Sequence, residues 1–284
     1  MKPIVKWAGG KSRLLPELLK NVPKSIDTYV EPFAGGAALF FELARRTRDK
    51  DGAGQFRHAR LADRNAELVT CYRAVRDSVE DVVEALQPYR YDRELYYATR
   101  AQDPKAMSDA ARAARLLFLN RTCYNGLWRV NSKGQFNVPF GRHTNPTILD
   151  AEHLREASKL LAGVEILLAD FSEATAGVTR RDFVYFDPPY VPVSKTADFT
   201  AYSAEKFGPA EQQRLSAELR ALKTRGVRAL LSNADTKETR RLYDGLSMRT
   251  VQMRRHINRD PMKRGDAAEL IVMTWSEKSK VLSS

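Results

Sequence analysis

The sequence predicts an α/β protein with one largely parallel, doubly wound sheet that is interrupted once by helices. Three observations lead to this fold class. Short β-prone runs alternate with segments of helical periodicity, a loop of small residues joins the first strand to a helix, and residues 73–118 show only helical periodicity. With 284 residues, 43% of them hydrophobic, the chain is long enough for one large domain or two small ones.

The first elements form a βαβ unit. A strand is predicted at Thr28–Val30, and the loop of small residues after it leads into an apolar helix over Ala37–Arg46. The next strand, His58–Ala62, ends on Asp63, and either Asp63 or Asn65 is expected to cap the helix after it. Strand, helix and strand in this order favour parallel pairing.

A helical insertion comes after this unit, because Val75, Val79 and Val82 recur at helical spacing. Later apolar runs predict the remaining strands, at 164–168, 183–186, 227–231 and 270–273. Lys50–Arg57 and Arg254–Gly265 are expected to be exposed basic loops, and we favour solvation over phosphate contact for Arg45–Arg57.

The charge balance favours a polyanionic partner. The chain has 47 Lys+Arg against 35 Asp+Glu, a net charge of +12, which suits nucleic acid but also acidic membranes. Cys71 and Cys123 are too few for a disulfide framework or a thiolate zinc site, and the histidines have no metal-ligand spacing. With no signal-peptide core and no run apolar enough to span a membrane, we expect a cytoplasmic protein without a metal.

Asp187-Pro188-Pro189-Tyr190 directly follows the apolar run at 183–186, where open α/β sheets place ligands. A carboxylate and a rigidly held carbonyl can each accept one hydrogen of a conjugated amine and stabilise the positive charge that develops on its nitrogen. Asp187 and the Pro188 carbonyl provide this pair, and Tyr190 offers a ring for a base lifted out of a duplex. Taken alone, the tetrapeptide is equally explained as a turn that ends the strand.

The loop Glu31–Ala37 lets a ligand approach the backbone, and the methionine part of S-adenosylmethionine suits it. Asp63 can then accept hydrogen bonds from ribose hydroxyls. Small residues also serve helix packing, and the dinucleotide-binding glycine pattern is absent. Ala8–Ser12 resembles the end of a P-loop, but Val5 occupies the position of the required glycine, so we reject nucleotide hydrolysis.

Seven motifs occur in the order seen in Dam-type (D12 class) DNA adenine-N6 methyltransferases, and the chain resembles this family over nearly its whole length. They are Lys6–Lys11, Glu31–Gly36, Leu61–Asn65, Asn120–Arg129, Gly134–Gly141, Asp187–Tyr190 and Ser232–Thr236. The resemblance implies a Rossmann-like S-adenosylmethionine-dependent methyltransferase with a mostly parallel sheet. It also implies an inserted, mainly helical DNA-recognition domain that carries a β-hairpin, over 67–146, with the catalytic domain over 1–66 and 147–284.

The resemblance also assigns roles to individual residues. Asp187, Pro188, Pro189 and Tyr190 are the expected catalytic residues. The expected cofactor-binding residues are Trp7, Lys11, Glu31, Phe33, Gly35, Gly36, Asp63, Asp170, Phe171 and Asp187. The expected DNA-binding residues are Lys6, Arg121, Tyr124, Asn125, Leu127, Arg129, Asn137, Pro139 and Arg142.

The predicted hairpin is supported by turn signals at Asn125-Gly126 and Lys133-Gly134. Arg129 suits a bidentate contact to guanine, and Arg121 and Arg142 suit phosphates, although hairpins and surface arginines are common without DNA. Trp128 stands at a position that varies in the family, so it is expected to affect flanking-base preference. Ala37 stands where many members have glycine.

We therefore expect a site-specific enzyme that binds double-stranded DNA as a monomer. It transfers a methyl group from S-adenosyl-L-methionine to N6 of a flipped adenine, within GATC, and leaves S-adenosyl-L-homocysteine. The alternatives are methylation of cytosine N4 or of a protein glutamine amide, and a catalytically silent DNA-binding protein with the same fold.

Overall fold

The computed structural model describes residues 1–7, 9–11, 13–50, 55–190, 207–253 and 267–276. Within these ranges a seven-stranded sheet has the order β3-β2-β1-β4-β5-β7-β6. The strands are β1 Ser25–Glu31, β2 Gln55–Asp63, β3 Glu165–Leu168, β4 Phe183–Phe186, β5 Arg228–Ala234, β6 Ser247–Met253 and β7 Ala267–Met273.

The first five strands in space are parallel to one another, and β7 and β6 pair in antiparallel fashion at one edge. The predicted mostly parallel sheet is therefore confirmed. Strand β6 was not predicted, because Met248 and Val251 are separated by two polar residues and the segment lacks the regular alternation that indicates a strand.

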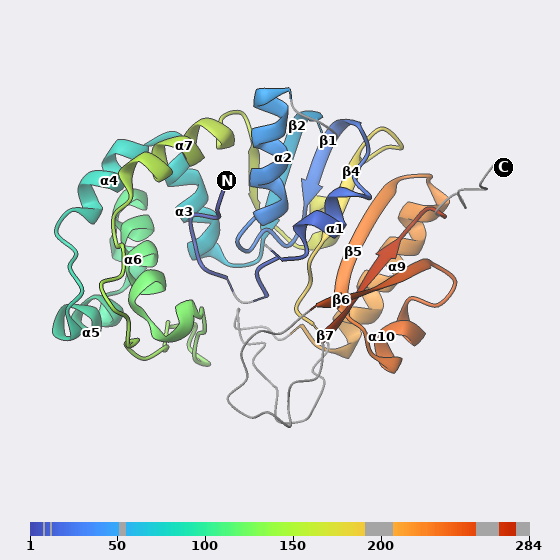
Figure 1. Cartoon of the computed structure of the whole chain (residues 1–284). Coiled ribbons are helices and arrows are strands. Elements are labelled where there is room, and N and C mark those ends of the chain that lie inside the picture. Colours follow the sequence, from blue (N-terminus) through green and yellow to red (C-terminus); the bar gives the residue numbers. More distant parts are fainter. Residues whose placement is uncertain (8, 12, 51–54, 191–206, 254–266, 277–284) are drawn as a thin grey trace.

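The helices lie on both sides of the sheet (Figure 1). Helices α3 to α6, from cyan to green, form the body beside β2 and β3, whereas α9 and α10 lie beside β5 to β7. The bounds are α1 Leu15–Leu19, α2 Ala38–Asp49, α3 Ala66–Asp77, α4 Val79–Leu86, α5 Arg93–Ala101, α6 Asp109–Thr122, α7 Ala151–Leu161, α8 Phe171–Ala174, α9 Pro209–Thr224 and α10 Lys237–Leu242, with single 3-10 turns at Pro104–Ala106 and Tyr124–Gly126.

Alternate side chains of the central strands enter two separate cores. In β4, Phe183 and Tyr185 face the core beneath α2, α3 and α6, whereas Val184 and Phe186 face the core beneath α9. Because both faces are buried, this strand is an uninterrupted apolar run. Each fully buried aromatic or leucine side chain contributes about 1.5–3 kcal/mol of transfer free energy, so the interior of the sheet rigidly supports the loops at the strand ends.

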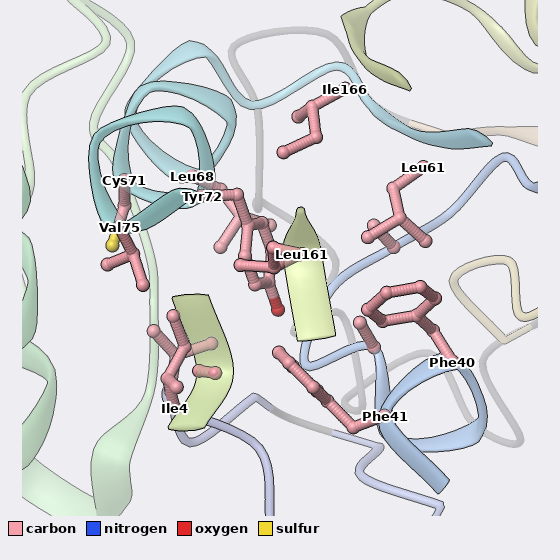
Figure 2. Packing of buried hydrophobic residues seen from close by; sticks show 14 of the residues in the cluster. Ile4, Phe40, Phe41, Leu61, Leu68, Cys71, Tyr72, Val75, Leu161 and Ile166 are labelled. Atoms are coloured by element: carbon pink, nitrogen blue, oxygen red, sulfur yellow. The ribbon is translucent and has the colours of Figure 1, made fainter. Parts of the chain in front are cut away.

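The larger core crosses the predicted domain boundary. Figure 2 shows Phe40 and Phe41 of α2 and Tyr72 of α3 packed with Leu61 of β2. The same cluster continues to Leu116 of α6, inside the predicted recognition domain. Helices of the insertion and the sheet thus share one hydrophobic core among the described residues, and the division at 67–146 stays a prediction.

Local signals explain the boundaries of the first βαβ unit. Asn65 caps α3, because its side-chain oxygen accepts from the backbone N–H groups of Glu67 and Leu68 at 3.1 and 3.2 Å. Ala37 precedes α2 with a left-handed φ of 49°, a conformation that suits glycine better than an L residue. The left-handed backbone conformation at this position therefore explains why many family members have glycine there.

Both described ends of the basic segment Arg45–Arg57 belong to regular elements. Arg45 to Asp49 complete α2, and β2 already begins at Gln55, so the predicted loop at Lys50–Arg57 was too long. The Arg45 and Arg48 guanidinium groups form ion pairs with Asp49 at 3.1 and 3.0 Å. The other predicted basic loop, Arg254–Gly265, lies outside the described residues.

Candidate active site

Asp187 lies directly after β4, at the carboxyl end of the parallel strands. Its Oδ1 atom is 2.8 Å from Lys11 Nζ and accepts a hydrogen bond from Ser232 Oγ at 3.1 Å. The Ser232 hydroxyl, from the neighbouring strand β5, also lies 3.0 Å from the Tyr185 hydroxyl. Lys11 and Ser232 therefore fix one carboxylate oxygen of Asp187 and orient the other.

Lys11 is buried, with only 5% of its side chain exposed. Its ammonium donates to the Gly9 carbonyl and lies 4.6 Å from the centre of the Tyr190 ring, a cation–π distance. A buried ammonium needs such compensation, and Asp187 supplies the opposite charge. The N-terminal motif and the tetrapeptide after β4 thus meet in one charged pair.

The remainder of the tetrapeptide is held from two other elements. Gln212 of α9 donates from Nε2 to the Pro189 carbonyl at 2.9 Å, and the Tyr190 hydroxyl donates to Glu269 Oε2 of β7 at 2.9 Å. Sequence reasoning missed Gln212 and Glu269 and gave Ser232 no role. Partners that lie 23 and 79 residues from the tetrapeptide leave no local pattern in a single sequence.

The ionisable groups of the site have shifted pKa values. Burial raises the pKa of Asp187 above its ordinary range, and the Lys11 ammonium offsets part of that rise. Burial also raises the pKa of Glu31 to about 8, although the Tyr29 hydroxyl, 2.7 Å from Glu31 Oε2, favours the charged form. At neutral pH Glu31 is therefore mostly protonated, and the charge of Lys11 is balanced by Asp187.

Asp63 joins the loops after β1 and β2. Its Oδ2 accepts from the Gly35 N–H at 3.0 Å, and its Oδ1 accepts from the Asn65 N–H at 2.9 Å. A carboxylate has about four acceptor positions, so each oxygen retains capacity for a ligand hydroxyl. Burial raises the pKa of Asp63, and these backbone donors lower it.

Trp7 covers the loop of small residues. A Cβ atom added to Gly35 would lie 2.8 Å from Trp7 Cδ1, and the φ of Gly35 is +45°, so both space and backbone conformation require glycine here. The Trp7 ring also stacks on Trp128, with centroids 6.1 Å apart and an interplanar angle of 17°. This contact connects the loop after β1 to the segment after α6.

Phe33, Phe171 and Asp170 form a second group near the ends of β1 and β3. The Phe33 and Phe171 rings stack with centroids 5.7 Å apart. The Asp170 carboxylate caps α8 and pairs with Arg214 at 2.6 Å, and the Arg214 guanidinium lies over the Phe171 ring. Phe171 itself is buried, so the half-buried Phe33 ring is the member of this pair that is suited to contact a heterocyclic base beside the carboxylate.

The segment after α6 forms a hairpin. Val130 pairs with Phe136, Cys123 pairs with Phe140, and the Asn137 N–H donates to the Arg129 carbonyl at 3.0 Å. Across the hairpin, Arg129 Nε donates to Asn137 Oδ1 at 2.8 Å. This contact orients Arg129 and leaves its terminal nitrogens to the solvent side.

The structure exposes most of the predicted DNA-binding residues. Leu127 and Asn137 are half-buried, and the exposed residues are Lys6, Tyr124, Asn125, Arg129, Pro139 and Arg142. The Lys6 backbone is fixed by two hydrogen bonds of 2.7 Å with the Asn120 side chain. A cavity of about 640 Å³ beside Pro139 extends this surface, with Arg93, Arg142 and His143 among its lining residues.

Two residues predicted at this surface lie inside the protein, and the predicted phosphate contact of Arg121 was wrong. Arg121 is buried, and its guanidinium donates to the carbonyls of Ile148 and Ile4, so it ties the chain together and is not available to a phosphate. Trp128 is also buried, between Trp7 and Phe136, and has no face for a flanking base. Both side chains support the hairpin from inside.

Comparisons with known proteins agree with this geometry. The profile of the family described as D12 class N6 adenine-specific DNA methyltransferase matches residues 7–257, which include the Lys11–Asp187 pair and the hairpin. The chain belongs to this family. It is an adenine-specific DNA methyltransferase, as the motifs predicted.

The similarity extends along whole relatives. The type II methyltransferase M.MjaIII of Methanocaldococcus jannaschii is 39% identical, over 97% of this chain and 99% of the relative. The type II methyltransferase M1.LlaDCHI of Lactococcus lactis subsp. cremoris is 37% identical, over 97% and 96%. The DNA adenine methylase of Escherichia coli K12 is 33% identical, over 96% and 95%.

The described part of this methyltransferase contains no group of three or more His, Cys, Asp or Glu side chains placed to hold a metal ion. None of its described helices combines the length and apolar character that crossing a membrane requires. The chemical resources of the site are a buried ion pair, oriented hydrogen-bond acceptors and aromatic rings.

Proposed function

We propose that this enzyme transfers a methyl group from S-adenosylmethionine to N6 of an adenine that is flipped out of duplex DNA. The observation that carries this proposal is the Asp187 carboxylate, fixed by Lys11 and Ser232 at the carboxyl end of β4. An amine of low nucleophilicity needs acceptors in fixed positions, because they stabilise the charge that develops as the nitrogen becomes tetrahedral.

The two oxygens of the Asp187 carboxylate have different proposed roles, one in holding the side chain and the other in contacting the substrate. Oδ1 is occupied by Lys11 and Ser232, whereas Oδ2 has no partner among the described residues. Oδ2 and the Pro188 carbonyl would each accept one N6 hydrogen. Gln212 holds the adjacent Pro189 carbonyl and thereby limits the freedom of the loop.

The residues around the loop after β1 fit S-adenosylmethionine, which supplies an electrophilic methyl group on a positively charged sulfur. Asp63 retains acceptor capacity for two ribose hydroxyls, and Trp7 packs directly on Gly35 and Gly36 at the edge of this loop. Beside Asp170, the half-buried Phe33 ring would meet the adenine ring of the donor, and the buried Phe171 ring supports Phe33 from behind.

Tyr190 is suited to hold the flipped base. Its hydroxyl is tied to Glu269 at 2.9 Å and its ring lies against the Lys11 ammonium, so the ring is oriented before a base arrives. Stacking on an oriented ring compensates part of the cost of unstacking the base from the duplex. Orientation also helps align N6 with the methyl group for in-line attack.

The hairpin is the proposed reader of the DNA sequence. Arg129 is exposed and oriented by Asn137, which suits a bidentate contact to guanine O6 and N7 in the major groove. Lys6 and Arg142 lie exposed for phosphates. We propose residues 67–146 as the recognition domain and, from the resemblance to Dam-type enzymes, GATC as the target.

Two experiments test the proposal. Plasmid DNA methylated in a host without other methyltransferases is digested to nucleosides and analysed by mass spectrometry, and N6-methyladenine is the expected product. N4-methylcytosine would overturn the proposal. Methylation-sensitive sequencing of the same plasmid is expected to place the modification at GATC, and confinement to another motif would overturn that target.

The role of Asp187 is tested by Asp187→Ala, with the exposed Asp244→Ala as the matched control. The first variant is expected to lose methyl transfer while retaining DNA binding, and the control is expected to match the wild type. A folded Asp187→Ala enzyme with the wild-type rate would remove Asp187 from the mechanism.

A further inference from the structure

A concavity of about 380 Å³ lies among the amino ends of the strands, and arginines line it. Arg57 comes from the start of β2, Arg180 and Arg181 from the turn before β4, and Arg228 from the start of β5. We call these four residues the arginine pocket. They come from three separate parts of the chain, so only the parallel pairing of the strands brings them together.

The arginine pocket is remote from the active site. The Asp187 tetrapeptide lies after the carboxyl end of β4, whereas the pocket lies at the opposite ends of the same strands. A strand as long as β1 spans roughly 20 Å at about 3.3 Å per residue. A short duplex centred on the hairpin and on Asp187 therefore does not account for these arginines.

The positive charge of the pocket is only partly neutralised. The Asp182 carboxylate is engaged by the backbone, because it accepts hydrogen bonds from the Thr28 and Thr179 N–H groups at 2.9 and 2.6 Å. Asp27 is the pocket's other carboxylate, and it lies 3.9 Å from Arg57 and 3.7 Å from Arg181. Within the described ranges neither Arg180 nor Arg228 has an ion-pair partner.

Several arginines elsewhere on the surface form close ion pairs. Arg48, Arg155 and Arg240 are each about half-exposed, and each lies within 3.0 Å of a carboxylate oxygen. Unpaired arginines gathered around one concavity repel one another, and binding an anion relieves that repulsion. The contrast indicates that the pocket is completed by an anion from outside the chain.

We propose that the arginine pocket binds backbone phosphates of a second DNA segment while the active-site edge holds the first. The guanidinium fork matches phosphate oxygens, and each phosphate contact releases condensed counterions. Arg57 and Arg181 are 82% and 76% exposed, which suits phosphates on a polymer surface better than an enclosed small anion. Because the substrate of the enzyme is DNA, other segments of DNA are the polyanions nearest to the pocket when the enzyme acts.

The proposal is tested by bridging of two duplexes. A labelled duplex with the target and a differently labelled duplex without it are mixed with the enzyme, and energy transfer between the labels reports both on one protein. The variant Arg57→Gln/Arg180→Gln/Arg228→Gln is expected to reduce bridging at least ~10-fold. Its affinity for the target duplex alone and its methylation rate on that duplex are expected to stay within about two-fold of wild type.

The control Arg48→Gln/Arg155→Gln/Arg240→Gln removes the same amount of charge from other surfaces. It is expected to bridge like the wild type, and equal losses in both variants would overturn the proposal. Absence of bridging by the wild type would overturn it too. As a measurement independent of any variant, wild-type bridging is expected to weaken with salt with a log–log slope of about −3, and a slope near zero would contradict phosphate binding.

Discussion

The two ends of the parallel strands use charge in opposite ways. At the carboxyl end, the buried Lys11 pairs with the partly buried Asp187, and Ser232 supports the carboxylate. At the amino end, Arg180 and Arg228 are exposed and have no ion-pair partner within the described ranges. One end holds a single charged pair in a defined geometry, whereas the other gathers like charges without fixing them.

The difference arises from the surroundings of each charge. In a buried site the low dielectric constant strengthens each interaction, so an unpaired charge is costly and geometry is strictly determined. On the surface, water and salt screen the charges over about 10 Å, and arginines attract a polyanion without a fixed arrangement. The first environment suits catalysis, and the second suits association. Variants of both kinds of site test this contrast, and the largest effect is expected at the buried pair.

Replacing the Asp187 carboxylate breaks the hydrogen-bonded network at the carboxyl end of the strands. Asp187→Asn is expected to lower the single-turnover methylation rate by about 10³-fold, because a neutral amide stabilises developing positive charge poorly. It also leaves Lys11 buried without its counter-charge, at a cost of about 3 kcal/mol in unfolding free energy. Adding Lys11→Met is expected to recover stability but not activity, as measured by urea denaturation and methyl transfer. Recovery of both would contradict the catalytic role.

Glu31 makes the same end sensitive to pH. Its pKa is about 8 in the folded state against an ordinary 4.5, so the folded state retains a proton that the unfolded chain releases. Stability from this group is complete below pH 4.5 and is lost as the pH rises to about 8. The free energy of unfolding of Glu31→Gln, measured relative to that of the wild type, should therefore rise by on the order of 3 kcal/mol from pH 5 to pH 9.

Chemical denaturation at the two pH values measures this difference, with the exposed Glu94→Gln as the control. Identical pH dependence of wild type and Glu31→Gln would show that Glu31 does not titrate in this range.

Arg129 combines properties of the charges at the two ends of the strands, because its side chain is exposed and yet is oriented by Asn137. Arg129→Lys retains the charge but loses the planar fork, so discrimination against a mismatched base is expected to fall by about 1–3 kcal/mol. Binding to matched and mismatched duplexes measures this. Arg142→Gln is the comparison, since losing a phosphate contact should weaken both duplexes equally. An equal loss for Arg129→Lys would remove its role in sequence reading.

Lys11 is expected to set the acidic limb of the pH profile. It favours the ionised form of Asp187, so Lys11→Met should raise the pKa of that carboxyl further. On the proposed role of Asp187, activity requires the carboxylate and is lost as pH falls through its pKa, so the acidic limb of kcat/KM should move to higher pH. A lower rate with an unmoved limb would assign Lys11 to binding alone.

Much of this protein was predictable because its signals are local. The apolar run at 183–186 predicted a strand with the tetrapeptide Asp187–Tyr190 at its end, and the structure has β4 there. Asn65 was one of two expected caps, and the structure selects it, since Asp63 binds the Gly35 N–H instead. Such features depend on a few consecutive residues and on the periodicity of side chains.

Burial and distant contacts were not predictable. Arg121 and Arg142 look alike in sequence, yet one is inside the protein and the other is exposed. Nothing near the tetrapeptide indicates that Gln212 and Glu269 hold it. Strand β6 became visible only through its pairing with β7.

By itself, the sequence determined the parallel α/β architecture, the family and the chemical types at the active site, because periodicity and short motifs encode them. Tertiary structure alone decided which oxygen of Asp187 is occupied, which arginines are buried, and that Arg57, Arg180 and Arg228 share one concavity. The physical reason is that packing brings together side chains far apart in the chain, and their mutual distances set the electrostatics.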